Sequence, residues 1–403
     1  MKAGNVAALV RGLCIDLTGR PLTVIYQKWT EKVPPSAMRL EIDSEDSEES
    51  AACKLRKSYE IWKNSNRAAN QKISLPSCVE LTVNGAAEAV FWTGSSFDSA
   101  KKRLTEKDYS PLEKIPAEKS AFISVTERSD AVKHKVALVT GGAQGIGEEI
   151  TRNLASVGAF VFIADLNIEG ARKLAERINA DEKRTAALPV GVNVSSEESV
   201  EAMFNTVAET TGGLDICVSN AGVLKAGSVL EQDIADFKFV TDINYTGFFI
   251  ISKFAGRLLR AQHLTSPDWK TDIIQVNSKS GLEGSNKNGA YAGGKFGGIG
   301  LTTSFAMELI EYGVKVNAIC PGNFLDGPLW SDPDKGLFVQ YLRAGKVPGA
   351  KSIADVRAFY ESRVPMKRGC TGKDLARAIL YVVEQEYETG QAVPVTGGQI
   401  MLH

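Results

Sequence analysis

The chain has 403 residues, of which 43% are hydrophobic and 24% are charged, and its formal net charge is −1. This composition is typical of a globular protein with one large domain and a smaller one, or with two or three small domains. The near-neutral charge excludes general electrostatic attraction to nucleic acid or to an anionic membrane, and we expect neither as a partner.

Cysteine usage and the N-terminal segment indicate the compartment. The six cysteines form no CxxC pair and only three histidines are present, so we expect free thiols in a reducing cytoplasm and no metal site. No apolar run is long enough to cross a bilayer. The short apolar stretch near the N-terminus is interrupted by Arg11 and Asp16. We therefore interpret it as a buried first element, and not as a signal peptide, in a cytoplasmic protein.

The first predicted elements are a hairpin and a helix. Residues 14–17 and 22–26 are largely apolar and flank the turn-forming Thr18-Gly19-Arg20-Pro21, which predicts two paired strands. Residues 47–66 are polar and helix-prone. The acidic run at 43–49 is interpreted as a solvated loop or a helix start, where carboxylates favour the helix dipole.

A second hairpin is predicted further along the N-terminal region. Residues 79–83 would pair with residues 89–92 through a connection that begins at Asn84-Gly85, a pair favoured where φ is positive. Residues 94–132 are charged and irregular, and we interpret them as a linker. Residues 1–93 should therefore form a smaller α+β region, and because we recognise no family in it, its role stays open.

Residues 133–403 are predicted to form one α/β domain. Short apolar strands alternate there with helical segments, as in a parallel sheet whose two faces are covered by helices. We expect a Rossmann-type doubly wound parallel sheet of about seven strands. The predicted strands are residues 136–139, 160–164, 188–192, 216–218, 273–276, 314–319 and 392–395.

A glycine-rich turn, Thr140-Gly141-Gly142-Ala143-Gln144-Gly145-Ile146-Gly147, follows the first of these strands and opens a helix. Glycines let the backbone approach a pyrophosphate, and the helix N-terminus supplies free N–H groups; Ile146 would pack beneath the turn. Asp165 ends the second strand, where a carboxylate can accept the adenosine ribose hydroxyls and repel a 2′-phosphate. Because no arginine stands at Gln144 or just after Asp165, we expect NAD and not NADP.

Ser278, Tyr291 and Lys295 predict an alcohol-oxidising site. Tyr291 and Lys295 are four residues apart, so on a helix they share one face, and Ser278 precedes Tyr291 by thirteen positions (291 − 278 = 13). Oxidation needs a base that takes the hydroxyl proton, but a free tyrosine has a pKa of about 10. We expect the Lys295 ammonium to lower the pKa of Tyr291.

A nucleotide loop followed by Ser, Tyr and Lys at these spacings resembles the short-chain dehydrogenase/reductase family, from about residue 133 to the end. The resemblance implies NAD-linked oxidoreduction. It also implies that Ser278 holds the substrate oxygen and that Lys295 holds the ribose hydroxyls. Asn244, in Asp242-Ile243-Asn244-Tyr245-Thr246-Gly247, resembles the fourth catalytic member, which positions a proton-relay water.

Three further pairs or triplets resemble the family's cofactor contacts. Asn220-Ala221-Gly222 resembles the element that stabilises the sheet beside the cofactor. Asn193-Val194 stands where the family usually has Asp-Val over the adenine. Pro321-Gly322 matches the turn beside the nicotinamide. The family often has threonine four residues after that glycine, whereas this chain has Asp326.

The substrate prediction rests on four longer stretches. They resemble the members of this family that interconvert sorbitol 6-phosphate and fructose 6-phosphate with NAD. A phosphate group needs cations, and the candidates are Lys279, Lys367 and Arg368, with Lys287 also nearby in sequence. Residues 324–363 are rich in Gly, Pro and Asp and are expected to form a substrate lid. The four stretches are residues 277–281, 295–302, 364–370 and 395–399.

Other interpretations stay open. The substrate could be an unphosphorylated polyol or a 3-oxoacyl group, although a carrier-protein substrate would need a basic docking patch. In a different class, the protein could be an NAD-sensing regulator or scaffold, although a sensor would not need all four catalytic residues. The family resemblance implies a homodimer or homotetramer packed through helices around residues 244–263 and 290–311. The N-terminal region could modify that assembly, cover the active site or bind a partner.

Overall fold

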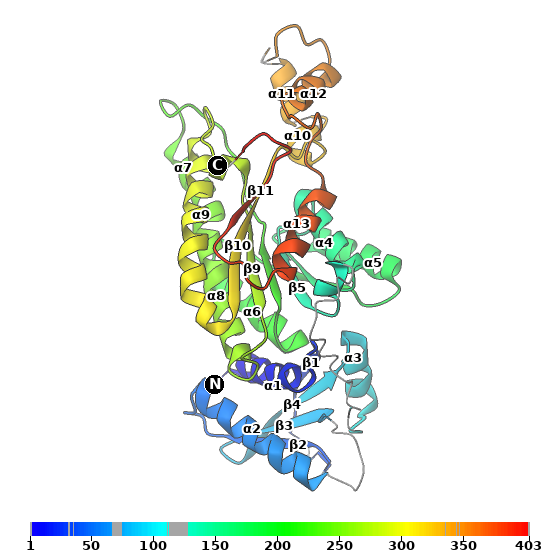
Figure 1. Cartoon of the computed structure of the whole chain (residues 1–403). Helices are drawn as coiled ribbons and strands as arrows, with labels where there is room; N and C mark the ends of the chain where they lie inside the picture. The colour runs from blue at the N-terminus through cyan, green and yellow to red at the C-terminus, as the bar shows by residue number, and fades with distance from the viewer. Residues whose placement is uncertain are drawn as a thin grey trace.

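Figure 1 shows the computed structural model of the chain, which describes residues 2–30, 33–34, 36–66, 75–110, 112, 128–334, 336–343, 345 and 347–401. It contains a four-stranded sheet in the N-terminal region and a seven-stranded sheet in the rest of the chain. In this described part, every helix is too short or too polar to cross a membrane.

The seven-stranded sheet confirms the predicted α/β class. All neighbouring strands in it are parallel, in the order β11-β10-β9-β8-β5-β6-β7. The order reverses between β5 and β8, and ligands bind at such a switch point in doubly wound folds. The strands are β5 (Val136–Thr140), β6 (Phe160–Asp165), β7 (Ala187–Gly191), β8 (Ile216–Ser219), β9 (Thr271–Val276), β10 (Val314–Pro321) and β11 (Ala392–Val395).

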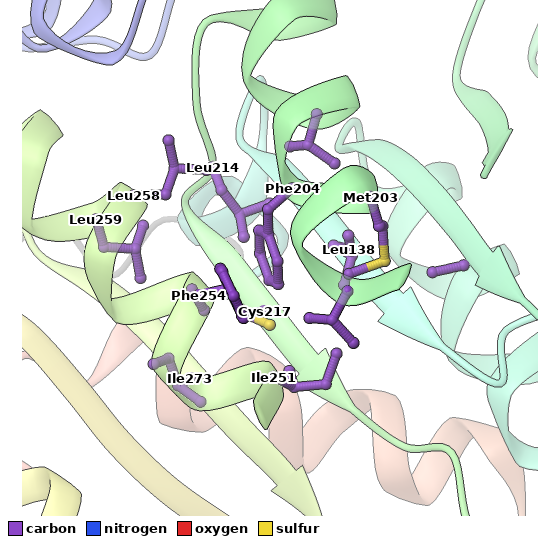
Figure 2. Close-up of a cluster of buried hydrophobic side chains, with 14 of the residues drawn as sticks. Leu138, Met203, Phe204, Leu214, Cys217, Ile251, Phe254, Leu258, Leu259 and Ile273 are labelled. Atoms are coloured by element: carbon purple, nitrogen blue, oxygen red, sulfur yellow. The ribbon is translucent and has the colours of Figure 1, made fainter. Parts of the chain in front are cut away.

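Helices cover both faces of this sheet, which explains its apolar strands. On one face, Phe204 and Phe254 pack with Cys217 of β8 in a buried cluster (Figure 2). The helices of that face are α6 (Glu197–Thr211), α8 (Gly247–His263) and α9 (Gly289–Leu309). The helices of the other face are α4 (Gly145–Ser156), α5 (Ile168–Glu182) and α13 (Gly372–Glu384).

The N-terminal region is a smaller α+β unit, as expected. Its sheet has the order β1-β4-β3-β2, in which β2 and β3 are parallel and the other neighbours are antiparallel. The elements of this region are α1 (Ala3–Thr18), β1 (Thr23–Lys28), β2 (Met38–Ile42), α2 (Glu48–Ser65), β3 (Cys78–Val83), β4 (Ala86–Gly94) and α3 (Phe97–Glu106).

The first predicted hairpin is wrong. Residues 14–17 belong to helix α1, and β1 pairs with β4 instead. Most residues of α1 are buried. Its sequence therefore contains a nearly continuous apolar run, without helical periodicity, which is also typical of a buried strand. The helix ends at Gly19, whose φ of 65° is left-handed, so the supposed hairpin turn is a helix C-terminus.

The second predicted hairpin and the helix before it are confirmed. Strands β3 and β4 are antiparallel, and Val83 pairs with Ala86, so the connection is shorter than predicted. It consists of Asn84 and Gly85, whose φ angles of 49° and 79° suit a two-residue hairpin turn. Ser47 caps helix α2 through its side chain, at the end of the acidic run.

The stretch 94–132, predicted to be irregular, begins with helix α3. This short, charged helix has few apolar residues, so its sequence shows no helical periodicity that would predict it. It packs on the N-terminal sheet and also contacts the larger sheet, since the rings of Phe97 and Phe160 lie 5.0 Å apart between centroids. Residues 113–127 of the predicted linker lie outside the described residues.

Helix α1 joins the two parts of the molecule. It lies between the two sheets, at the end where the strands of the larger sheet begin (Figure 1). Arg11 of α1 is buried and its guanidinium contacts the Asp215 carboxylate, just before β8, at 2.7 Å. Ligands bind at the opposite, carboxyl ends of such strands. The N-terminal region therefore does not cover the active site of the same chain.

Candidate active site

The glycine-rich loop between β5 and α4 has the shape that a pyrophosphate requires. Gly141 and Gly145 have φ angles of 61° and 57°. A Cβ at Gly147 would lie 2.0 Å from the carbonyl oxygen of Gly141. Helix α4 begins after Gln144, whose side chain makes no capping bond, so its first N–H groups stay available to a ligand. Ile146 packs against the core beside this loop.

Asp165 lies at the end of β6, beside this loop. One carboxylate oxygen accepts a hydrogen bond from the Ala143 N–H at 3.0 Å, and the other accepts one from the Asn167 N–H at 2.9 Å. These bonds fix the carboxylate and leave lone pairs for ribose hydroxyls. The next residue, Leu166, is 78% exposed and uncharged. Asp165 therefore places a fixed carboxylate beside the glycine-rich loop.

The predicted adenine contacts are only partly available. Val194 is buried in the core beside α8. Asn193 is exposed, and its side-chain oxygen accepts hydrogen bonds from the N–H and the hydroxyl of Ser195 at 3.1 and 2.8 Å. Asn193 therefore stabilises a local turn, although its amide nitrogen can still face a ligand.

The Asn220-Ala221-Gly222 segment ties β8 to the glycine-rich loop. The Asn220 amide donates to the carbonyl oxygens of Thr140 and Gly141 at 2.9 and 3.1 Å. The N–H groups of Asn220 and Ala221 both donate to the Thr140 hydroxyl at 3.0 Å. The segment thus fixes the loop from the neighbouring strand.

Pro321 is the last residue of β10, and Gly322, where a turn is predicted, continues the pairing with β11. The Gly322 N–H donates to the Val395 carbonyl at 3.0 Å, and a Cβ there would lie 2.6 Å from the Gln399 side-chain oxygen. Asp326, at the position where the family often has threonine, pairs with Arg357 at 2.7 Å. Its carboxylate is therefore engaged with the segment that follows β10.

Ser278, Tyr291 and Lys295 come together at the carboxyl end of β9. Ser278 follows the strand, and Tyr291 and Lys295 lie in the first turns of α9. The side chains of Ser278 and Tyr291 are hydrogen-bonded. The Lys295 ammonium lies 5.6 Å from the Tyr291 ring centroid and donates to the Val276 carbonyl at 2.8 Å.

Asn244 lies in a π-helical turn, Asp242–Thr246, between α7 (Ile234–Thr241) and α8. Such turns often occur at functional sites. Its amide accepts from the Val223 N–H and donates to the Val223 carbonyl, both at 2.8 Å. A Cβ at Gly222 would lie 3.3 Å from the Asn244 oxygen and 3.9 Å from the Lys295 ammonium. Asn244 therefore borders the lysine from a second helix.

The electrostatics of the site differ from the sequence-based expectation. Burial raises the pKa of Tyr291, and the hydrogen bond with Ser278 opposes that rise without cancelling it. Burial lowers the pKa of Lys295 to about 8, with the Cys320 thiol acting in the opposite direction. Burial also raises the pKa of Cys320 to about 11. Tyr291 is therefore protonated near neutral pH. The prediction that the pKa of Tyr291 is lowered is wrong, because burial raises it.

The three cations predicted to bind a phosphate lie in different surroundings. Lys279 directly follows Ser278 and is half-buried in the turn Lys279–Gly281. The Arg368 guanidinium makes two hydrogen bonds with Asp374, at 2.6 and 2.9 Å, and thereby stabilises the start of α13. The Lys367 ammonium donates to the Ser362 carbonyl at 2.7 Å. Lys279 is thus the candidate adjacent to the catalytic set.

The expected lid segment forms a small body at the end of the molecule opposite the N-terminal region (Figure 1). Trp330 lies at its centre, with ring centroids 5.2 Å from Phe338 and 4.9 Å from Tyr360. A Cβ at Gly145 would lie 3.4 Å from Pro328, so the segment reaches the glycine-rich loop. Its helices are α10 (Pro328–Ser331), α11 (Leu337–Arg343) and α12 (Ile353–Ser362).

Three side chains around the catalytic set are not among the residues predicted from the sequence. Gln275 and Asn277 are buried beside α9, and Cys320 is buried near Tyr291 and Lys295. Two amide side chains that alternate with apolar residues at the end of a parallel strand indicate a buried hydrogen-bonded pair, because buried amides need hydrogen-bond partners. The cysteine has no comparable pattern.

Comparisons with known proteins agree with this geometry. The short chain dehydrogenase family matches residues 135–332. Sorbitol-6-phosphate 2-dehydrogenase of Escherichia coli is 35% identical over 271 residues, which cover 66% of this chain and 99% of that protein. The crystal structure of sorbitol-6-phosphate 2-dehydrogenase from Erwinia amylovora has a TM-score of 0.61 and 36% identity, covering 66% of this chain and 100% of that one. The crystal structure of a variant of actinorhodin polyketide ketoreductase with NADPH has a TM-score of 0.59 and 28% identity. The match covers 67% of this chain and 98% of that one.

Proposed function

Because this chain belongs to the short-chain dehydrogenase/reductase family and is an oxidoreductase of that family, we propose that it interconverts sorbitol 6-phosphate and fructose 6-phosphate with NAD. The observation that carries the proposal is the 35% identity with the Escherichia coli sorbitol-6-phosphate 2-dehydrogenase along 99% of that protein. The direct test is oxidation of sorbitol 6-phosphate with NAD, with the product identified as fructose 6-phosphate by mass spectrometry and chromatography. A different product, or none, would reject the proposal.

In this proposal the catalytic residues move one proton and stabilise charge. After its phenol has lost a proton to solvent, Tyr291 takes the hydroxyl proton of the substrate when the alcohol is oxidised, and as the neutral phenol it donates that proton when the ketone is reduced. Ser278 donates a hydrogen bond to the substrate oxygen and stabilises its developing charge. Lys295 holds the cofactor ribose, and Asn244 positions a relay water beside it. NAD, when bound, supplies the hydride acceptor.

We propose that the cofactor is NAD, although the ketoreductase of similar fold was crystallised with NADPH. The fixed carboxylate of Asp165 supports NAD because it would face the 2′-phosphate of NADP with a like charge. The proposed cofactor-binding residues are Gly141, Gln144, Gly145, Ile146, Gly147, Asp165, Asn193, Val194, Asn220, Ala221, Gly222, Tyr291, Lys295, Pro321 and Gly322.

Asp165→Asn is expected to raise the ratio of kcat/KM for NADP to that for NAD by about 10- to 100-fold, because it removes the like charge and keeps the side-chain shape. Steady-state kinetics with both cofactors measure this ratio. Asp181→Asn is the control, because its side chain is 71% exposed on the neighbouring helix α5. An unchanged ratio in Asp165→Asn would show that this carboxylate does not select the cofactor.

For the substrate phosphate we propose Lys279 as the main cation, with Lys367 and Arg368 as further members. Lys279 is supported by its place beside Ser278. Arg368 could contribute only if its two hydrogen bonds to Asp374 were exchanged for the phosphate. An unphosphorylated polyol would not need any of these three cations, so their substitution separates the two substrates.

A 3-oxoacyl substrate is the second candidate, favoured by the 28% identity with a polyketide ketoreductase. It is weaker because that structure carries NADPH, whereas Asp165 disfavours the extra phosphate. Reduction of a 3-oxoacyl thioester, measured beside the sugar phosphate, distinguishes the two. An NAD-sensing scaffold would bind the cofactor without turnover of either compound.

We propose a homodimer or homotetramer packed through α8 and α9. Large apolar side chains on these helices are exposed in the single chain, among them Phe249, Phe296 and Met307, and exposed apolar patches of this kind mark interfaces. Analytical ultracentrifugation would reject the proposal if the protein sediments as a monomer at micromolar concentration.

A further inference from the structure

Two buried amides lie on one face at the end of strand β9, one in the strand and one directly after it. Gln275 and Asn277 are 2% and 3% exposed. Because they are two residues apart along an extended segment, both side chains lie on the side that faces α9. A buried amide is costly unless it is hydrogen-bonded, so their partners show what the pair does.

Asn277 connects the loop that carries Ser278 to the helix that carries Tyr291 and Lys295. Its side-chain oxygen accepts a hydrogen bond from the Ser278 N–H at 2.8 Å. Its amide nitrogen donates to the Lys295 carbonyl at 2.9 Å. The same nitrogen donates to the Gln275 side-chain oxygen at 2.7 Å, which holds the Asn277 amide in place.

Two glycines make room for this pair of amides. A Cβ at Gly281 would lie 2.1 Å from the Asn277 side-chain oxygen, and a Cβ at Gly298 would lie 2.4 Å from the Gln275 side-chain nitrogen. Gly281 lies in the Ser278 loop and Gly298 lies on α9, so loop, strand and helix all approach closely at this point. This packing gives a physical reason for glycines in two of the stretches that suggested the substrate, residues 277–281 and 295–302.

We propose that Asn277, held by Gln275, is a positioning residue that fixes Ser278 relative to Tyr291 and Lys295 for proton transfer. The inference rests on the proposed alcohol-oxidising function of the site, because it assigns Asn277 to that chemistry and not only to folding. Neither amide contacts the substrate in this account. Each acts through the backbone of the catalytic residues.

The chain offers a matched control in Asn317 on the neighbouring strand β10. Asn317 is 1% exposed. Its amide nitrogen donates to the Glu388 carbonyl at 3.1 Å, and its side-chain oxygen accepts from the Gln391 N–H at 2.9 Å. The two asparagines therefore have similar burial and similar backbone partners, but Asn317 binds the loop before β11 and no catalytic residue.

The first measurement compares Asn277→Ala with Asn317→Ala in the full chain. We expect kcat to fall by about 10- to 100-fold in Asn277→Ala, because a misplacement of about 1 Å costs that much, while KM for NAD changes by less than about threefold. Asn317→Ala should keep kcat within about twofold although it loses similar thermal stability. Asn277→Ser, which cannot reach the Lys295 carbonyl, replaces Asn277→Ala if the latter does not fold.

The second measurement needs no substrate and follows ionisation of Tyr291. Ultraviolet titration of each chain, minus its Tyr291→Phe counterpart, gives the titration of this phenol alone. The Ser278 hydrogen bond lowers the pKa of Tyr291, so its loosening in Asn277→Ala should move the titration to higher pH. Lys295 from α9 and Cys320 from β10 are the titratable groups that interact with this site, and neither is changed in the variants.

The outcomes separate the two proposals. If the wild-type chain oxidises no tested alcohol, the proposed function fails, and the titration alone decides the role of Asn277. The positioning role is overturned if Tyr291 titrates identically in Asn277→Ala and wild type. It is also overturned if kcat falls equally in Asn277→Ala and Asn317→Ala, because the loss would then follow stability alone.

Discussion

Tyr291→Phe is expected to lower kcat for alcohol oxidation by about 10³-fold, while the protein still folds and binds NADH. The substitution removes a single oxygen atom, and with it the group proposed to take the substrate proton. The aromatic ring that lies 5.6 Å from the Lys295 ammonium is kept, so packing around the lysine should change little.

Steady-state kinetics and a fluorescence titration with NADH test this expectation. Tyr387→Phe is the control, because Tyr387 is fully exposed and remote in sequence from the site. The pH profile adds a second check. Since burial raises the pKa of Tyr291, oxidation by the wild-type chain should accelerate as pH rises above neutral. A Tyr291→Phe chain with wild-type kcat would show that another group takes the proton.

Arg11→Met is expected to destabilise the whole chain by about 3–5 kcal/mol, because it leaves a buried carboxylate without its partner. Both side chains of the Arg11–Asp215 pair are fully buried, with the charged atoms 2.7 Å apart. Arg11 also donates to the Leu22 carbonyl and to the Gln262 side chain, both at 2.8 Å. One residue of the N-terminal region thus neutralises a charge inside the larger domain.

Chemical denaturation followed by circular dichroism measures this loss. Arg56→Met is the control, because Arg56 also connects the N-terminal region to the larger domain, by donating to the Thr265 carbonyl at 3.0 Å, but its ion pair with Asp16 is partly exposed and should contribute only about 0–1 kcal/mol. Asp215→Asn in the Arg11→Met background should restore part of the loss, because it removes the unpaired charge. Equal stability of Arg11→Met and Arg56→Met would mean that the pair does not link the two parts of the chain.

The same pair predicts how stability depends on pH. Burial alone would raise the pKa of Asp215, but Arg11, together with Lys135 and the hydrogen bond from the Val136 N–H, outweighs burial and the net pKa is lowered. A carboxylate with a lowered pKa stabilises the folded state fully above its unfolded pKa of about 3.9. This stabilisation should therefore be lost as pH falls below about 4, through the folded pKa, and Arg11→Met should remove that part of the acid sensitivity.

Local patterns explain why much of the larger domain could be predicted from the sequence. The strands of a doubly wound sheet are apolar because both of its faces are covered. The spacing of the glycines in the loop Gly141–Gly147 is uncommon outside nucleotide-binding loops. The helix spacing of Tyr291 and Lys295 likewise needs no tertiary information. These features depend on residues close together in the chain.

The remaining features depend on contacts between distant residues. Residues 14–17, at the end of helix α1, are wrongly predicted as a strand because most of this helix is buried, and periodicity alone cannot distinguish a short buried helical segment from a buried strand. Arg11 and Asp215 are separated by 204 positions. The pKa of Tyr291 depends on burial that only the folded chain creates. Arg368 and Asp374 are only six positions apart, but no sequence pattern shows that they pair, and the pairing lowers the availability of Arg368 for a phosphate.

The ratio of kcat/KM for sorbitol 6-phosphate to that for sorbitol, measured with NAD, decides whether the enzyme recognises a phosphate on its substrate. We expect a ratio of at least about 100, because a phosphate bound by a cation contributes charge-assisted hydrogen bonds that the neutral polyol lacks. Lys279→Ala should lower kcat/KM for the phosphate and leave that for sorbitol unchanged. Equal turnover of the two polyols, unaffected by Lys279→Ala, would show that the enzyme does not recognise the phosphate.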